Sequence, residues 1–191
     1  MDIETTGFRG QGYITVIGLY DGKTSEVFVK GKNLGDFRKE IRKYALLVTY
    51  NGKQFDLPFI RDTFGELPRH LGHIDLRYPL KRLGYTGGLK IVEGRLGLNR
   101  DEALGCLDGL CAVWLWQEYE RENKKALDTL IRYNLEDVVA LPSLAAITYN
   151  GLIKGLPIAA SKLYVSGRPV IDIPYDQRLV RKLAERRARF A

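Results

Sequence analysis

Cysteine, histidine and methionine are scarce in this sequence. Its 191 residues include two cysteines, two histidines and one methionine. A structural zinc site takes four cysteine or histidine ligands, so this chain would need Cys106, Cys111, His70 and His73 together to build one. A chain of this length buries a sizeable apolar core without disulfides or a structural metal. We therefore interpret both cysteines as reduced, buried residues of an ordinary core.

Long apolar runs are also missing. Apolar residues make up 45% and charged residues 28% of the chain, as in an ordinary globular protein. No run is long enough to cross a bilayer, and the first residues lack the charged-then-apolar pattern of a signal peptide. We therefore expect a cytoplasmic protein with no membrane partner.

The excess of basic over acidic residues is concentrated at the C-terminal end of the chain. The formal net charge is +7, and residues 178–191 hold six Arg and Lys against one Glu. Such a tail either follows a phosphate backbone, releasing counterions, or forms an exposed helix that packs Leu179, Val180 and Leu183 inward. We expect one domain over residues 1–175, followed by a basic helix or tail over residues 176–191.

Periodicity predicts an α/β fold. β-branched and aromatic runs predict strands, and apolar residues three or four apart predict helices. The expected strands are the opening segment and residues 13–20, 25–31, 45–51 and 73–78. The expected helices include residues 34–44, 55–65 and 127–147, with Pro142 bending the last one or marking a boundary in it. Together these elements predict a mixed sheet covered by late helices.

Four carboxylates are expected to converge in this fold. Asp2 and Glu4 lie one residue apart, so in a strand they share a face. Asp56 follows a buried strand, and Tyr133 and Asp137 lie one helical turn apart. Alone, Asp56 would be read as a helix N-terminal residue and Tyr133 with Asp137 as a surface pair. Together, such like charges need cations, and Mg²⁺ or Mn²⁺ suit an all-oxygen ligand set.

Three motifs in the chain resemble one enzyme family. "DIETTG" resembles the Asp-x-Glu motif of the DnaQ-like (DEDD) 3′-to-5′ exonucleases, "NGKQFD" resembles their second motif, and "YNLED" their third. Arg132 stands where the other branch of the family has His, which indicates the tyrosine branch. The similarity looks closest to stand-alone domains of the YprB type and extends to about residue 148. The resemblance implies a ribonuclease H-like fold with a mixed five-stranded sheet flanked by helices.

The resemblance also implies catalytic roles and two divalent metal ions, Mg²⁺ or Mn²⁺. Asp2, Glu4 and Asp137 would bind the tighter metal, with Asp2 bridging to a second metal and Asp56 positioned through that metal or its waters. Tyr133 would orient the attacking water or help to deprotonate it. The implied reaction is hydrolysis of phosphodiester bonds by a two-metal mechanism.

Substrate contacts follow from the same resemblance. Asn51 would hold the second motif or the terminal nucleotide, and Thr5 and Phe55, within the motifs, would contact substrate. The expected substrate is a single-stranded DNA or RNA 3′ end, because a deep carboxylate site must admit a frayed terminus.

Several alternatives stay open. The chain could be a catalytically weakened nucleic-acid-binding or partner-docking module of the same fold, or a hydrolase of small nucleotide esters. Only Met1 precedes Asp2, so we expect a truncated chain or a start assigned too late. Asp75 is either an acceptor behind the site or a structural residue. Of Trp114 and Trp116, one is expected in the core and the other in a protein contact or a base-stacking platform.

Overall fold

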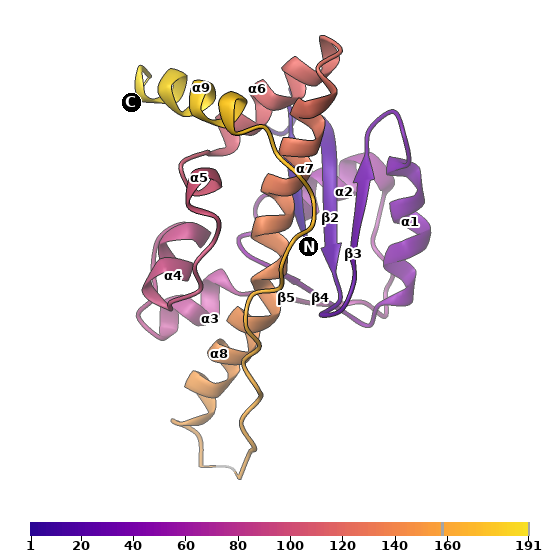
Figure 1. Cartoon of the computed structure of the whole chain (residues 1–191). Helices are drawn as coiled ribbons and strands as arrows, with labels where there is room; N and C mark the ends of the chain where they lie inside the picture. Colours follow the sequence, from indigo (N-terminus) through magenta and orange to yellow (C-terminus); the bar gives the residue numbers. More distant parts are fainter. Residues whose placement is uncertain (158, 191) are drawn as a thin grey trace.

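The computed structural model describes residues 1–157 and 159–190; Ile158, in the predicted domain, and Ala191, in the predicted tail, lie outside the described residues. The strands are β1 (Asp2–Thr5), β2 (Ile14–Tyr20), β3 (Ser25–Val29), β4 (Leu46–Thr49) and β5 (Gly72–Asp75). The helices are η1 (Leu34–Asp36), α1 (Phe37–Glu40), η2 (Ile41–Lys43), α2 (Asp56–Phe64), α3 (Arg77–Arg82), α4 (Leu89–Arg95), α5 (Glu102–Gly105), α6 (Gly109–Glu120), α7 (Lys124–Val139), α8 (Leu141–Ile153) and α9 (Gln177–Ala188). The predicted α/β organisation is confirmed (Figure 1).

The first three strands form an antiparallel sheet in the order β1-β2-β3. Asp2 is opposite Gly18 on β2, and Val16 is opposite Val29 on β3. Strand β2 is almost wholly buried, because Val16 packs toward α6 and α7 while Ile17 packs toward α1 and α2. A strand covered on both faces reads as a continuous apolar run, as "ITVIGLY" does.

The predicted five-stranded sheet is wrong, because β4 and β5 form a separate parallel pair. The two sheets are joined where the Met1 amino group donates to the carbonyl of Val48, at 2.8 Å. The amide of Ile3, which also points away from β2, donates instead to Asp56 Oδ1, at 3.1 Å. A side chain of the site thus takes up a donor that a continuous ladder of β1 with β4 would have used.

Helix α7 crosses the sheet and contacts both β1 and β2 (Figure 1). Its close approach depends on Gly18, where a Cβ atom would lie 2.1 Å from Asn134 Oδ1 and 2.9 Å from Val138 Cγ2. The predicted helix over residues 127–147 is divided in two, and Pro142 lies in the first turn of α8. Pro142 therefore marks a helix boundary, one of the two predicted outcomes.

Residues 163–176, here called the return segment, run back along α8 and α7 (Figure 1). The side-chain amide of Asn150 donates to the carbonyl of Leu163 and accepts from its amide, both at 2.8 Å. Further along, Arg132 Nη1 donates to the carbonyls of Ile171 and Ile173 at 2.8 and 3.0 Å. An extended segment without strand partners thus satisfies its backbone through side chains of the helices.

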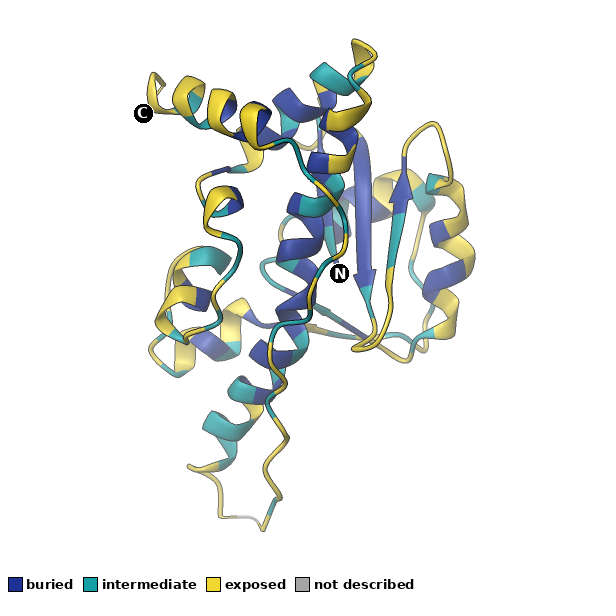
Figure 2. Ribbon diagram, in the orientation of Figure 1, coloured by how far each residue is buried: buried dark blue, intermediate teal, exposed yellow. Residues whose placement is uncertain are grey.

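The return segment leads into α9, the predicted basic helix. Leu179, Val180 and Leu183 are buried in the same core as Trp114, while the opposite face of α9 is exposed (Figure 2). Within the described residues, no helix is long and apolar enough to cross a membrane. Cys111 is buried as predicted, whereas Cys106 is exposed, because it lies at the end of the short helix α5.

Candidate active site

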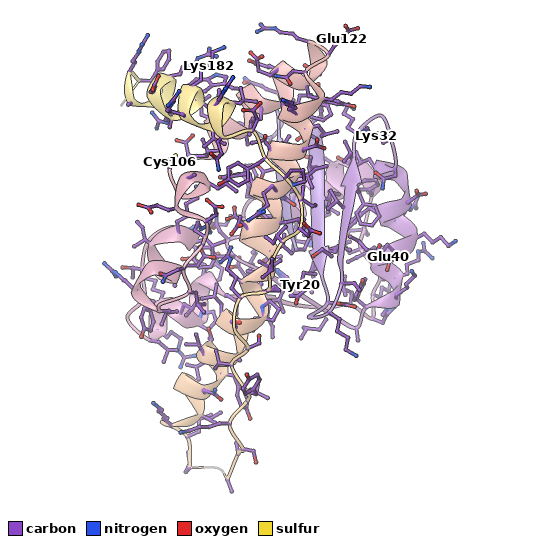
Figure 3. All side chains as sticks on the ribbon, viewed as in Figure 1. Tyr20, Lys32, Glu40, Cys106, Glu122 and Lys182 are labelled. Carbon is purple, nitrogen blue, oxygen red and sulfur yellow. The ribbon has the colours of Figure 1, made fainter. Side chains whose placement is uncertain are left out.

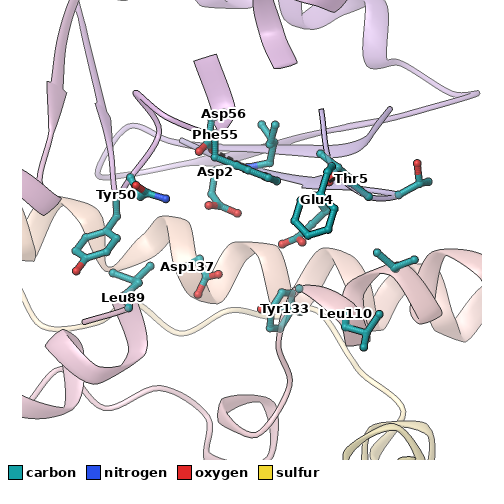
Figure 4. Close-up of a pocket in the computed structure, with 18 of the residues that line it drawn as sticks. Asp2, Glu4, Thr5, Tyr50, Phe55, Asp56, Leu89, Leu110, Tyr133 and Asp137 are labelled. Carbon is teal, nitrogen blue, oxygen red and sulfur yellow. Dashed lines mark hydrogen bonds between the residues drawn. The ribbon is translucent and has the colours of Figure 1, made fainter. Parts of the chain in front are cut away.

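Three carboxylates meet between β1 and α7 (Figure 4). Alternation along β1 points Asp2 and Glu4 toward the helix, while Ile3 packs into the core on the other face. Asp137 faces them from α7. One carboxylate oxygen of each of the three residues lies within 4.8 Å of the others. The predicted convergence of acidic residues is therefore present for Asp2, Glu4 and Asp137, which come from two segments, β1 and α7.

Asp56 lies beside this group of three but is not part of it. It is the first residue of α2, it is buried, and its Oδ1 accepts the hydrogen bond from the amide of Ile3. The contact ties α2 to β1 directly behind Asp2. Its predicted role at a second metal stays a prediction.

Burial raises the pKa values of Asp2, Glu4 and Asp56, and repulsion from neighbouring carboxylates adds to the shifts of Asp2 and Glu4. Burial raises the pKa of Asp2 well above its usual value, and Asp56 and Glu4 add to the shift. Burial, followed by the charge of Asp137, raises the pKa of Glu4 in the same way. Burial is also the main reason that the pKa of Asp56 reaches about 7. A divalent cation with a preference for hard oxygen ligands would relieve this repulsion, and the all-oxygen donor set fits one.

Tyr133 lies one turn before Asp137 and faces the same cleft. Burial, with the charges of Asp137 and Glu4, raises its pKa well above the usual value. The Nζ atom of Lys90 lies 4.9 Å from the centre of its ring. The Tyr133 hydroxyl therefore keeps its proton and can donate a hydrogen bond within the cleft.

Asn134 is a site residue that the sequence motifs did not single out. Its Nδ2 donates to Asp2 Oδ2 at 2.9 Å and lies 3.4 Å from Glu4 Oε1. It is fully buried, and the hydrogen bond to Asn134 lowers the pKa of Glu4 against the larger effect of burial. One signal was available, because Asn134 occupies a polar position on the apolar stripe that includes Leu130 and Val138.

A buried ionic network lies behind Asp137. Arg100 Nη1 is 2.6 Å from Asp137 Oδ1, and Arg100 Nε donates to Glu93 Oε2 at 2.8 Å. Arg168, from the return segment, lies 3.2 Å from Glu93 Oε1 and 2.6 Å from Glu136 Oε2. These arginines come from segments with no motif, so spacing alone gave no indication of them.

Asp75 shapes the loop that carries the second motif. Its carboxylate accepts hydrogen bonds from the amides of Asn51, Lys53 and Arg77, at 2.7, 3.0 and 3.1 Å. Asn51 has a positive φ of 66°, a conformation that Asn tolerates better than most residues. Arg77 also donates to the side-chain oxygen of Asn51. Asp75 thus holds the loop behind Asn51 by accepting hydrogen bonds from it, so its two predicted alternatives coincide.

A cleft of about 680 Å³ brings the predicted site residues together. The predicted site residues on its wall are Asp2, Glu4, Thr5, Asn51, Phe55, Asp56, Tyr133 and Asp137. Phe8 and Leu110 also line it and are exposed. Both tryptophans are buried, Trp114 at 7% and Trp116 at 4% exposed, so neither offers the base-stacking platform that was one of the predicted alternatives. Trp116 donates to Glu120 at 2.8 Å, and Trp114 is covered by α9.

Carboxylates from a strand and a helix, gathered on the wall of a cleft in an α/β fold, are typical of metal-dependent enzymes that act on phosphoesters. A sequence model of the RNase H superfamily matches residues 1–149. The chain therefore belongs to the RNase H superfamily, most members of which are nucleases that use divalent metals. No curated protein and no solved structure gives a significant match to the chain.

Proposed function

We propose that the protein is a metal-dependent 3′-to-5′ exonuclease of the DnaQ-like type, acting on single-stranded ends. The observation that supports this most directly is the group of three carboxylates within 4.8 Å, on the wall of a cleft that also holds Tyr133. Asp2, Glu4 and Asp137 would hold the tighter metal, with Asp56 next to a second one. A pair of Mg²⁺ or Mn²⁺ ions there would supply Lewis acidity and lower the pKa of a water molecule.

The chain's own residues orient the reactants in this proposal. Tyr133, which keeps its proton, donates a hydrogen bond that orients the attacking water. Asn134 holds the Asp2 carboxylate, at 2.9 Å, and Arg100 holds Asp137 from behind, at 2.6 Å. Fixed carboxylates lower the cost of reorganisation during reaction.

The shape of the cleft supports a strand end as the substrate. Its volume of about 680 Å³ lies within the range of pockets that enclose a small ligand. Such a cleft suits a frayed terminal nucleotide better than a duplex. Thr5, Asn51 and Phe55, which border the cleft, would contact that nucleotide.

The test is hydrolysis of 5′-labelled single-stranded DNA and RNA with Mg²⁺, Mn²⁺ or EDTA. Wild type should produce a ladder that shortens from the 3′ end and needs metal. Asp2→Ala and Asp137→Ala should abolish it, whereas Asp128→Ala, at an exposed position of α7, should not. The two polymers compared side by side also show whether DNA or RNA is preferred.

Other outcomes would contradict the proposal in distinguishable ways. Internal cleavage would indicate an endonuclease of the same superfamily. Cleavage of a nucleotide p-nitrophenyl ester, with no action on oligonucleotides, would indicate a hydrolase of small esters. Binding of oligonucleotides without any cleavage would indicate a non-catalytic binding module.

A further inference from the structure

The outward face of α9 carries a high density of positive charge. Its apolar side packs on α6, and its exposed charged residues are five cations, Arg178, Arg181, Lys182, Arg186 and Arg189, and one acid, Glu185. Lys182 is labelled on this helix in Figure 3. Among the described residues, the only carboxylate that pairs with a cation of α9 is Asp108, which contacts Arg187. With one exposed acid against five exposed cations, the basic face keeps a net positive charge.

The last turn of α9 is attached to the wall of the cleft. Arg187 Nε lies 2.5 Å from Asp108 Oδ2, and Asp108 Oδ1 caps α6 by accepting from the amides of Leu110 and Cys111, at 3.1 Å each. Gly109 and Leu110, the first residues of α6, line the cleft. The basic face thus begins beside the cleft that holds the carboxylates.

Side chains of α6 and α9 connect the cleft with the basic face of α9. Leu110 and Trp114 lie one turn apart on α6 and so share a face. The Arg186 guanidinium stacks over the Trp114 ring at 4.0 Å, and the Phe190 ring centre lies 5.9 Å from that of Trp114. Phe190 is 67% exposed, next to the basic side chains. An exposed aromatic ring beside exposed cations is typical of surfaces that bind single-stranded nucleic acid.

The basic face of α9 fits a nucleic-acid strand better than an anionic membrane. A basic amphipathic helix binds a membrane by burying its apolar side in the lipid. In α9 that side is already occupied, since Leu179, Val180 and Leu183 are buried in the protein core. A lipid surface would meet cations and one aromatic ring, Phe190, without an apolar helix face to bury, whereas a phosphodiester backbone offers regularly spaced charges and bases to stack.

We propose that the outward face of α9 binds the phosphate backbone of the strand whose 3′ end occupies the cleft. This inference rests on the proposed function for the direction of the strand. The helix has 12 residues and is about 18 Å long at about 1.5 Å per residue. A helix of that length can follow several consecutive phosphates of one strand. It would hold the substrate while terminal nucleotides are removed.

The experiment measures binding of a labelled long oligonucleotide and of a labelled dinucleotide by fluorescence anisotropy, in EDTA and over a range of KCl concentrations. The test variant combines Arg181→Gln with Lys182→Gln. The control combines Arg38→Gln with Lys39→Gln, which are exposed on α1, across the molecule from α9 (Figure 1). Both variants lose two positive charges, so any difference between them reflects position.

We expect the test variant to bind the long oligonucleotide about tenfold more weakly than wild type, with the control unaffected. The slope of log affinity against log salt should become less steep by about 1.4, since each lost contact to a single strand contributes about 0.7. The dinucleotide, too short to reach α9, should show no such difference.

Equal binding by wild type, test variant and control would overturn the inference, as would equal losses in the two variants. It would also fail if wild type bound phosphatidylserine vesicles or polyglutamate as tightly as the oligonucleotide, since α9 would then select only for negative charge. Because binding is measured without metal, an absence of cleavage would count against the proposed activity alone, and loss of binding in the test variant would still support the α9 surface.

Discussion

Asp56→Asn should remove a large pH dependence from the stability of the metal-free protein. Burial raises the pKa of Asp56 from 3.8 to about 7, a shift of about three pH units. At about 1.36 kcal/mol per unit, the folded state loses about 4 kcal/mol relative to the unfolded state as pH rises through this range. Stability falls as pH rises for the following reason. Between pH 3.8 and about 7, Asp56 of the folded protein keeps a proton that Asp56 of the unfolded chain has released, so a higher pH favours the unfolded state.

Urea unfolding in EDTA at about pH 4 and about pH 8 measures this effect. Wild type should lose about 4 kcal/mol more unfolding free energy between the two pH values than Asp56→Asn does. The asparagine keeps an oxygen that can accept the Ile3 amide, so the tie to β1 can persist. Because Asp56 also raises the pKa of Asp2, the measured difference includes that part.

A matched control separates this burial effect from a general change in charge. Asp128→Asn removes an exposed carboxylate from α7 and should leave the wild-type pH dependence in place. If Asp56→Asn and wild type lost the same free energy between the two pH values, the reasoning from burial would be refuted.

Three further outcomes are expected. Gly18→Ala should destabilise the fold by about 1–3 kcal/mol in thermal or urea unfolding, because the new Cβ meets Asn134 Oδ1 at 2.1 Å; an unchanged midpoint would contradict this. Arg168→Met should cost about 3–5 kcal/mol, because it leaves the buried Glu93 and Glu136 short of positive charge; stability within about 1 kcal/mol of wild type would argue against it. Mn²⁺ added to the metal-free protein should raise the melting temperature more at about pH 8 than at about pH 5, because at about pH 5 the metal must displace protons from more of the carboxylates. The reverse order would exclude carboxylates as the ligands.

The candidate site was largely predictable because its motifs depend on local geometry. Alternation in a strand fixes the common direction of Asp2 and Glu4, and helical spacing fixes that of Tyr133 and Asp137. Asp56 follows β4 closely in sequence, so the order of elements sufficed to bring it to the same cleft. Strand alternation, helical spacing and the order of the elements are therefore enough to predict where the acidic residues lie.

The division of the sheet and the partners behind the site could not be predicted in the same way. The ladder between β1 and β4 is replaced because Asp56 takes the amide of Ile3, a contact between residues far apart in sequence. Arg100 and Arg168 likewise reach their partners from loops with no periodic pattern. Such contacts depend on the assembled tertiary structure, which spacing along the chain does not record.

The return segment has a consequence for the order in which this protein matures during synthesis. Glu93 and Glu136 belong to the part of the chain that matches the superfamily, yet a cation that both contact, Arg168, lies beyond residue 149. As a ribosome extends the chain, the earlier residues can collapse, but two buried acids remain undercompensated until Arg168 has emerged. The ionic network behind Asp137 therefore forms completely only late in synthesis, when Arg168 joins Glu93 and Glu136.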